Sequence, residues 1–251
     1  MDNDLKYKII KPNKALSAFV DSFWFLHNQS DSDKETIGLP DGRIDLSLFK
    51  SAKDPFRMVL LGLNAQALPA TIPANTLMFV VSFKLPAVEY IFGERISDII
   101  DYGKICSSGF WGFSEIDLLD FDAFVEKATK KIESLLPLEI DPRKAALFEL
   151  IYASKGSIPV KELSEKAAWS SRQINRYFND QFGISLKAYC NILRFRASLE
   201  HIAKGKLSPE ENFFDQTHFI KEIKKFTGVV PKELLKNKND RFILLSSLTV
   251  L

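Results

Sequence analysis

Hydrophobic residues recur at helical spacing in the C-terminal part of the chain, most clearly between positions 158 and 203. Apolar side chains three or four positions apart predict one helix over residues 160–167 and a second over about 171–182. The Trp169-Ser170-Ser171 break separates them, and serine is a good N-cap for the second helix. A long third helix is expected from about Leu186 to Ala203, capped by Ser185. The pattern therefore predicts a helix-turn-helix followed by a long helix.

The second of these helices has two chemically different faces. Its apolar face is made of Ile174, Tyr177, Phe178 and Phe182. The opposite stripe carries Arg172, Asn175 and Arg176, spaced so that the three side chains project together. Arginine and asparagine suit the guanine and adenine edges of a major groove, so the stripe predicts base reading by these three residues. A solvated helix face is the alternative interpretation.

Short apolar runs with proline and glycine between them dominate the first part of the chain. Strands are predicted for residues 43–49, 58–62 and 77–83, while residues 70–75 are rich in turn formers. Residues 22–26 fit a strand or a helix equally well. This pattern predicts a small sheet or barrel.

After Pro86 the pattern becomes helical. Short helices are expected at residues 87–93 and 96–100, and a clear amphipathic helix at 122–136. A break between Pro137 and Pro142 marks a domain boundary, after which Asp141 caps a further helix.

The predicted fold class is α+β: a β-rich, barrel-like N-terminal domain with flanking helices, then an all-α domain. We divide the chain into a sensor or dimerisation domain (1–120), a linker helix (121–140), a DNA-binding domain (141–240) and an apolar tail (241–251). The tail is unusually apolar for a terminus, and we expect it to pair with a sheet edge or to pack on the other domain.

Charge is unevenly distributed along the chain. Residues 1–120 hold 12 basic and 16 acidic residues, whereas residues 121–251 hold 22 and 16, so the net charges are −4 and +6. The basic part is the one suited to a polyanion such as DNA.

Several other classes of protein are disfavoured. The first ten residues carry charges where a signal peptide needs an apolar core, and no apolar run has the length of a membrane span. Cys106 and Cys190 are far apart and are expected to be free thiols in a reducing cytoplasm. Three scattered histidines predict no metal site, and we expect no cofactor and no membrane partner.

Two motifs resemble the AraC family of bacterial transcription regulators. The first begins at Ser170-x-Arg172-x-Ile174-x-Arg176-x-Phe178 and continues to Phe182-Gly183-Ile184-Ser185. The second runs from Asp215-Gln216-Thr217-His218-Phe219 to Gly228-Val229-Val230-Pro231. The resemblance implies two helix-turn-helix units that enter successive major grooves of double-stranded DNA.

An internal repeat with an offset of 45 residues supports the second unit. Ile174 corresponds to Phe219, Gly183 to Gly228 and Arg176 to Lys221, so a second recognition helix is expected over about 216–226. Its predicted DNA contacts are Gln216, Thr217, Lys221, Lys224 and Lys225. Ser171, as an N-terminal residue of the first recognition helix, and Arg194, as a phosphate contact, complete the predicted interface.

The chain also departs from this family. Only residues 206–212 precede the second recognition helix, about four residues fewer than the family has. Ala168 and Asn212 stand where the family has turn glycines, and alanine adopts a left-handed backbone only at some cost. We therefore expect the first unit to be the dependable reader of bases, and the second either to bind mainly phosphates or to have lost specificity.

The first half looks like the N-terminal domain of one AraC-type subgroup. The resemblance rests on the segment from Lys11 to Trp24, on Pro40-Asp41-Gly42 and on Val81-Ser82-Phe83-Lys84. It implies signal sensing or homodimerisation, and contact with RNA polymerase for an activator. A plain hairpin turn is the alternative interpretation of Pro40-Asp41-Gly42. Trp24 and Trp111 fit either a ligand pocket or a hydrophobic core.

Three functions follow from these features. A DNA-binding transcription regulator is favoured, with a small-molecule effector for its N-terminal domain. An interaction or sensing module with weak or lost DNA binding is the alternative, because its second unit is short. An enzyme is disfavoured, because no cluster of His, Asp and Glu and no nucleophile motif is present.

Overall fold

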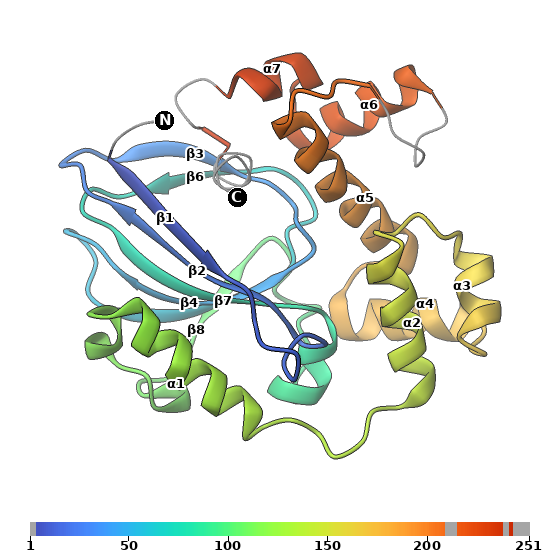
Figure 1. Cartoon of the computed structure of the whole chain (residues 1–251), viewed down its shortest axis with the longest axis horizontal. Coiled ribbons are helices and arrows are strands. Elements are labelled where there is room, and N and C mark those ends of the chain that lie inside the picture. The colour runs from blue at the N-terminus through green and yellow to red at the C-terminus, as the bar shows by residue number, and fades with distance from the viewer. Residues whose placement is uncertain (1–3, 209–214, 238–240, 243–251) are drawn as a thin grey trace.

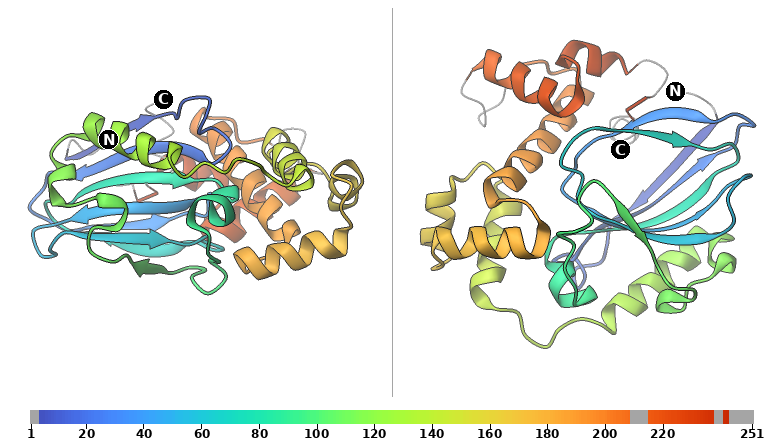
Figure 2. Two further views of the ribbon diagram at one scale, coloured as in Figure 1. Left: turned by 90° about the horizontal axis from the view of Figure 1, so that it is seen from below. Right: turned by 180° about the vertical axis from the view of Figure 1, so that it is seen from behind.

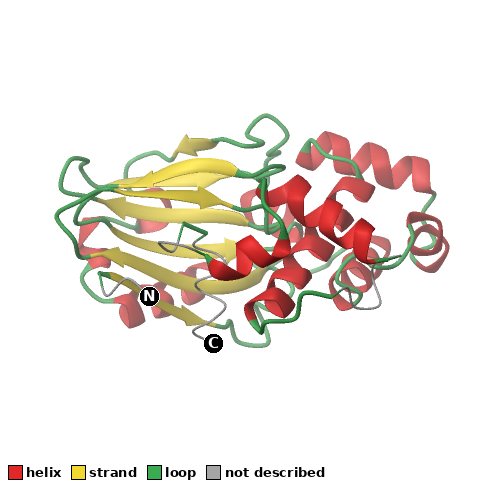
Figure 3. Ribbon diagram, turned by 90° about the horizontal axis from the view of Figure 1, so that it is seen from above, coloured by secondary structure: helices red, strands yellow, loops and turns green. Residues whose placement is uncertain are grey.

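The computed structural model describes residues 4–208, 215–237 and 241–242. Strands gather on one side of the molecule and most helices on the other, as Figure 3 shows. Figure 2 shows from two further directions that the helical domain stands beside one end of the sheet. The α+β fold class is confirmed.

Among the described residues, the strands form an open antiparallel sheet of six, in the order β1-β2-β7-β4-β5-β8, and a separate pair, β3-β6. Their bounds are β1 Leu5–Ile10, β2 Val20–Asn28, β3 Lys34–Gly38, β4 Ile44–Lys50, β5 Arg57–Leu61, β6 Leu68–Ile72, β7 Leu77–Phe83 and β8 Gly103–Ile105. Of the two expected arrangements, a small sheet or a barrel, the structure has the open sheet. The two edge strands are β1, which pairs with β2, and β8, which pairs with β5 over only three residues. Within the described residues these two edges do not pair with each other, so the sheet does not close.

Three short helical segments and α1 complete the first domain. They are the π-helix η1 (Val88–Phe92), the 3₁₀ segments η2 (Phe110–Gly112) and η3 (Glu115–Leu118), and α1 (Phe121–Glu133). Figure 1 shows α1 lying along one face of the sheet. Phe79 of β7 packs there against Phe121 and Phe124, with ring centroids 5.2 and 5.5 Å apart. The sheet therefore has an aromatic core on this face.

In the part of the chain that the structure describes, six helices make up the second domain. They are α2 (Pro142–Ala153), α3 (Val160–Lys166), α4 (Ser171–Phe182), α5 (Leu186–Ala203), α6 (Gln216–Thr227) and α7 (Pro231–Lys236). Helices α2–α4 gather at one end of α5, and α6 and α7 lie at its other end (Figure 1). The bounds of α3, α4 and α5 agree with the helices expected from hydrophobic spacing.

Three local expectations were resolved or corrected. Residues 22–26 belong to a strand. Residues 70–72, the first part of the turn-rich segment 70–75, belong to β6, because Leu68–Ile72 pairs along the whole of β3. Residues 96–100 form turns and no helix: Ile99 N donates to the Ile96 carbonyl within a single turn, and the chain then leaves helical geometry at Asp101, whose φ is 59° and whose N donates to the Leu63 carbonyl.

The first residues of the predicted apolar tail contact the sheet domain. Ile37 N of β3 donates to the carbonyl of Arg241 at 2.6 Å, and the Phe242 side chain is buried. The rest of the tail, 243–251, lies outside the described residues, as does the segment 209–214 that contains Asn212.

No helix in the described part of the chain is long and apolar enough to cross a membrane. The same residues contain no group of His, Cys, Asp and Glu side chains arranged to hold a metal ion. Cys106 and Cys190 are free thiols.

A polar relay crosses the sheet at its centre. Trp24 Nε1 donates to Ser82 Oγ at 2.9 Å, and Ser82 Oγ donates to Asp45 Oδ1 at 2.5 Å. Burial raises the pKa of Asp45 to about 7, and the neighbouring Asp41 carboxylate adds to the effect. The folded chain therefore binds the Asp45 proton more tightly than the unfolded chain does.

Replacing Asp45 by Asn should remove one source of pH dependence from stability. A carboxyl group whose folded pKa is raised favours folding at low pH, and this contribution is lost as pH rises from about 4 through 7. The variant should thus be more stable than the parent by about 1–3 kcal/mol at pH 8 and nearly equal to it at pH 4. Denaturant unfolding at both pH values measures the difference. Asp98→Asn, on an exposed turn, is the control, and a pH-independent difference for Asp45→Asn would contradict this account.

Candidate nucleic-acid interface

A tight turn joins α3 to α4. Ala168 has a left-handed backbone, with φ of 49°. It stands at the turn position where the AraC family has a glycine. Trp169 is buried immediately after it. Ser170 Oγ then accepts a hydrogen bond from Gln173 N at 3.3 Å, which caps α4 as expected. The local geometry is that of a helix-turn-helix.

The inner face of α4 is held by aromatic packing. Ile174, Phe178 and Phe182 are fully buried. The rings of Phe178 and Phe182 lie 5.1 Å apart, and Phe148 of α2 packs on Phe178 at 5.9 Å. This packing fixes the rotation of α4 about its axis, and so determines which residues face outward.

The outer face of α4 presents two unpaired guanidinium groups. Arg172 and Arg176 are exposed, and neither side chain forms a hydrogen bond or ion pair with any described residue. Asn175 is partly buried, and its Nδ2 donates to the carbonyl of Ser171 at 2.9 Å. The two arginines are therefore available to a groove, whereas Asn175 must give up an internal hydrogen bond to read adenine through both its amide atoms.

Helix α6, the predicted second recognition helix, has a more basic outer face than α4. Asp215 Oδ1 caps the helix by accepting from His218 N at 2.7 Å. Thr217, Lys221 and Lys224 are exposed. The remaining two predicted residues have contacts of their own: Gln216 Nε2 donates to the carbonyl of Leu207 at 3.0 Å, and the Lys225 ammonium lies 5.3 Å from the Phe226 ring.

Helix α5 is the rod between the two recognition helices, as Figure 1 shows. Its 18 residues span about 27 Å, which is comparable with one turn of B-form DNA at about 34 Å. Phe195 of α5 stacks on Phe226 of α6 at 4.7 Å and joins the second unit to the rod. Arg194, predicted to contact phosphate, is partly buried and donates to Asn191 Oδ1 at 2.5 Å.

A family model described as a helix-turn-helix domain matches residues 163–237. This segment is an AraC-type helix-turn-helix domain. A second model, described as a domain of unknown function (DUF6597), matches residues 8–103 of the sheet domain. No curated protein matches the chain.

Among solved structures, the chain is similar to ToxT from Vibrio cholerae. One ToxT structure has 12% identity and a TM-score of 0.43, over 93% of this chain and 98% of that one. Another, of ToxT bound to (E)-4-(8-methylnaphthalen-1-yl)but-3-enoic acid, has 13% identity and a TM-score of 0.41, over 97% and 100%. At this level of likeness, function has to be argued from the residues of the chain itself.

The AraC-type domain and α2 are anchored to the sheet domain by Glu89 of η1. Tyr177 of α4 donates to Glu89 Oε2 at 2.8 Å, and Lys144 Nζ of α2 lies 2.6 Å from Glu89 Oε1. Burial and the Glu89 carboxylate raise the pKa of Tyr177 above its usual value, so its hydroxyl remains a donor. The inner side of the first recognition helix is thus attached to the other domain.

The C-terminal end of α4 also abuts the sheet domain. Gly183 ends the helix with φ of 71°, and a Cβ at this position would lie 2.8 Å from the carbonyl oxygen of Ser97. The close approach leaves room only for glycine. Together with Ile96 N donating to the Gln181 carbonyl, it fixes α4 at its end while its N-terminal half stays open.

The Pro40-Asp41-Gly42 turn contacts α5. Gly42 has φ of 74°, and a Cβ there would lie 2.9 Å from Leu193 Cδ2. Its carbonyl accepts from the Tyr189 hydroxyl at 3.1 Å, and Tyr189 shares a hydrogen bond with Tyr152 of α2 at 3.0 Å. The turn is therefore part of the contact between the domains. It is more than the plain hairpin turn given as the alternative interpretation.

A buried ionic cluster completes the contact between the domains. Asp21 of β2 accepts from Arg43 Nη2 at 2.8 Å and from Arg196 Nη2 of α5 at 3.2 Å. Burial acts to raise the pKa of Asp21, but the two guanidinium groups outweigh it and hold the pKa far below its usual range. The carboxylate is therefore charged at neutral pH and links the sheet to the rod.

Sequence reasoning missed these linking residues. Asp21 lies inside the Lys11–Trp24 segment, but the resemblance there rests on other residues, and Glu89 lies in no motif. Their partners Arg196 and Tyr177 are 175 and 88 positions away. The one available signal was Pro40-Asp41-Gly42, whose left-handed glycine marked a special backbone position but not its partner.

Proposed function

We propose that the chain is a sequence-specific DNA-binding transcription regulator. Helix α4 would read bases through Arg172 and Arg176, with Ser171 and Asn175 beside them. Helix α6 would enter the next major groove with Gln216, Thr217 and Lys221, while Lys224 and Lys225 meet phosphates.

The observation that carries this proposal is the free state of the Arg172 and Arg176 side chains. The two exposed arginines have no carboxylate partner and repel each other. The aromatic packing on the buried face of α4 nevertheless holds them in one stripe. A bidentate arginine–guanine contact is the commonest specific contact in the major groove. The net charge of +6 over residues 121–251 supports the same polyanionic partner.

We further infer that the sheet domain senses a signal and passes it to the helical domain. Glu89, Asp21 and Gly42 contact α2, α4 or α5 directly, so a change in the sheet domain would alter the setting of the recognition helices. A homodimer and, for an activator, contact with RNA polymerase remain predictions. A regulator of bacterial genes would act in the cytoplasm.

Duplex binding by the full chain should depend steeply on salt. Five basic residues on α4 and α6 face outward, so neutralising about as many phosphates gives a slope near −4 in log affinity against log salt concentration. Fluorescence anisotropy with a labelled random duplex, repeated between low and physiological salt, measures this slope.

Absence of duplex binding even at low salt would contradict the proposal. That result would favour the alternative of an interaction module, which the short connection between α5 and α6 motivates. A shallow slope would instead indicate that only one of the two helix-turn-helix units contacts DNA.

A further inference from the structure

Strand β8 is one edge of the six-stranded sheet (Figure 2), and no described strand pairs with its outer side. Cys106 N donates to the Met58 carbonyl at 2.9 Å, so the backbone of Cys106 faces β5. In an antiparallel pair only every second residue faces the partner strand in this way. The N–H and C=O groups of Gly103 and Ile105 therefore point away from β5, to the open side.

One face of this edge is apolar. The Ile105 side chain is 70% exposed, and Leu61 of β5, on the same face, is 40% exposed. Gly103 lies opposite Leu61 and two residues before Ile105. A Cβ at Gly103 would lie 2.7 Å from Leu61 Cδ2, so the Leu61 side chain leans over the glycine. The edge thus exposes two apolar side chains next to a backbone position without one.

A second copy of the same strand fits this edge when it runs antiparallel about a two-fold axis at Lys104. Gly103 then lies opposite Ile105 of the second copy, and the two residues exchange both of their free backbone hydrogen bonds. The isoleucine of the second copy lies over Gly103 and meets Leu61 beyond it. The edge therefore supplies both the exposed isoleucine and the glycine that receives it.

The charges at this edge also suit a second copy. Lys104, at the axis, forms an ion pair with Glu94 on the face opposite to Ile105. A lysine on an edge strand ordinarily discourages pairing, and two lysines that meet across an axis repel each other. Here each lysine brings its own carboxylate, so the contact has no net charge.

We propose that β8 is a dimerisation edge, at which two copies of this chain form one continuous antiparallel sheet. The contact uses the three residues of β8 from each copy. It is small beside a stable dimer interface, which buries about 800 Å² per partner, so dimerisation should depend on protein concentration.

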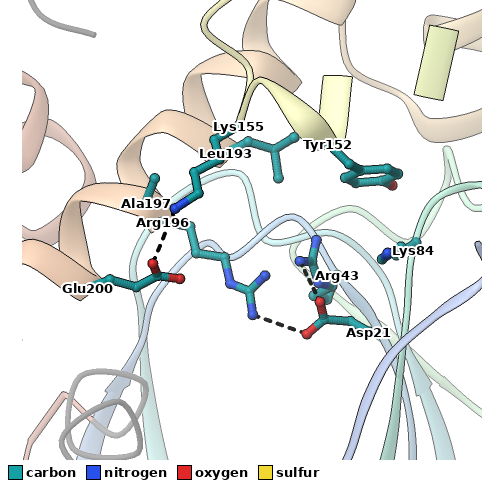
Figure 4. A pocket seen from close by; sticks show the side chains of 9 residues that line it. All are labelled: Asp21, Arg43, Lys84, Tyr152, Lys155, Leu193, Arg196, Ala197 and Glu200. Carbon is teal, nitrogen blue, oxygen red and sulfur yellow. Dashed lines mark hydrogen bonds and ion pairs between the residues drawn. The ribbon is translucent and has the colours of Figure 1, made fainter. Parts of the chain in front are cut away.

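The edge is joined to the helical domain by the segment that precedes it. Ile96 N donates to the Gln181 carbonyl at the end of α4 at 3.0 Å. The ionic cluster of Asp21, Arg43 and Arg196 ties α5 to the sheet at a second place (Figure 4). Pairing at β8 would therefore fix the separation of the two α4 helices. An effect on DNA binding rests on the proposed function, whereas dimerisation itself does not.

Sedimentation equilibrium of the full chain without DNA tests the proposal, so dimerisation and DNA binding can fail separately. The parent should show a reversible monomer–dimer equilibrium. Ile105→Asp should weaken the dimer by about tenfold or more, because it buries a carboxylate between Gly103 and Leu61. Ile116→Asp, at an exposed isoleucine of η3, is the matched control and should dimerise like the parent. A parent that stays monomeric, or an Ile105→Asp variant that dimerises as the control does, would overturn the proposal.

A cysteine at the axis tests the register of the two strands. Lys104 lies opposite Lys104 of the second copy in a pair without hydrogen bonds, with Cα atoms about 4.5 Å apart, which a disulfide can span. Lys104→Cys, in a Cys106→Ser background, should form an intermolecular disulfide when diamide is added as oxidant. Ile116→Cys in the same background is the control and should form far less. Equal yields from the two variants, or a dimer that forms no disulfide at position 104, would place the contact elsewhere and overturn the proposal.

Discussion

Replacing Asp21 by Asn is expected to lower the free energy of unfolding by about 3–5 kcal/mol, since it removes the carboxylate that the buried Arg43 and the partly buried Arg196 share. Asp21 is the carboxylate that Arg43 and Arg196 share, and its side chain is 11% exposed. An asparagine fills the same space but supplies no charge. The loss should therefore exceed that of most surface substitutions by a wide margin.

Chemical denaturation of the parent and the variant at pH 7 measures this difference. Asp122→Asn is the matched control, because Asp122 pairs with Lys8 in an exposed ion pair whose loss should barely change stability. The pKa of Asp21 is lowered on folding, so its contribution is complete above the usual carboxyl range and shrinks as pH falls below it. The two curves should converge on acidification. A loss no larger than the control's would contradict the ionic link between the domains.

The double replacement Arg172→Ala, Arg176→Ala should abolish preference for the specific duplex. Each arginine that reads a guanine contributes about 1–3 kcal/mol, and the loss falls on the specific site more than on random DNA. Both side chains are exposed and unpaired, so folding stability should stay close to that of the parent.

Competition binding with specific and random duplexes separates base reading from simple charge attraction. Lys14→Ala, Arg95→Ala is the matched control, because it removes two exposed cations from the sheet domain. The control should lose little affinity on either duplex. Equal losses on specific and random DNA in the Arg172 and Arg176 variant would reduce the two arginines to phosphate contacts.

Local signals were enough to predict the helix-turn-helix. Ser170 as a cap, Gly183 as a left-handed end and an apolar stripe between them all act within a few residues, so the bounds of α4 follow from the sequence. The positive φ of Ala168 was also predictable, because a tight turn between two helices demands it whatever the residue.

Non-local pairing was not predictable. Strand β6 contains Pro69 and lacks alternation, and it forms because β3 offers it a complete partner. Residues 96–100 resemble a helix in pattern, yet Asp101 N, the next backbone donor, bonds to the carbonyl of Leu63, which is distant in the sequence. The choice between an open sheet and a barrel could not be made from the sequence for the same reason, since closure depends on whether two distant edges meet.

The candidate site divides along the same line. Which residues face outward on α4 and α6 could be derived from helical periodicity, because burial on one side fixes exposure on the other. Which of them have internal contacts could not, as Asn175, Gln216 and Arg194 show. The role of Asp21 and Glu89 in the contact between the domains could not be predicted, because no local pattern distinguishes a carboxylate that links two domains from one on the surface.

The most direct measurement of DNA reading by α4 is selection of random duplexes by the full chain and by Arg176→Ala, followed by sequencing. The parent is predicted to enrich a site with two preferred elements about one helical turn apart, and the variant to lose base preference within one element only. Enrichment of the same bases to the same extent by both proteins would contradict the assignment of α4 as the reading helix.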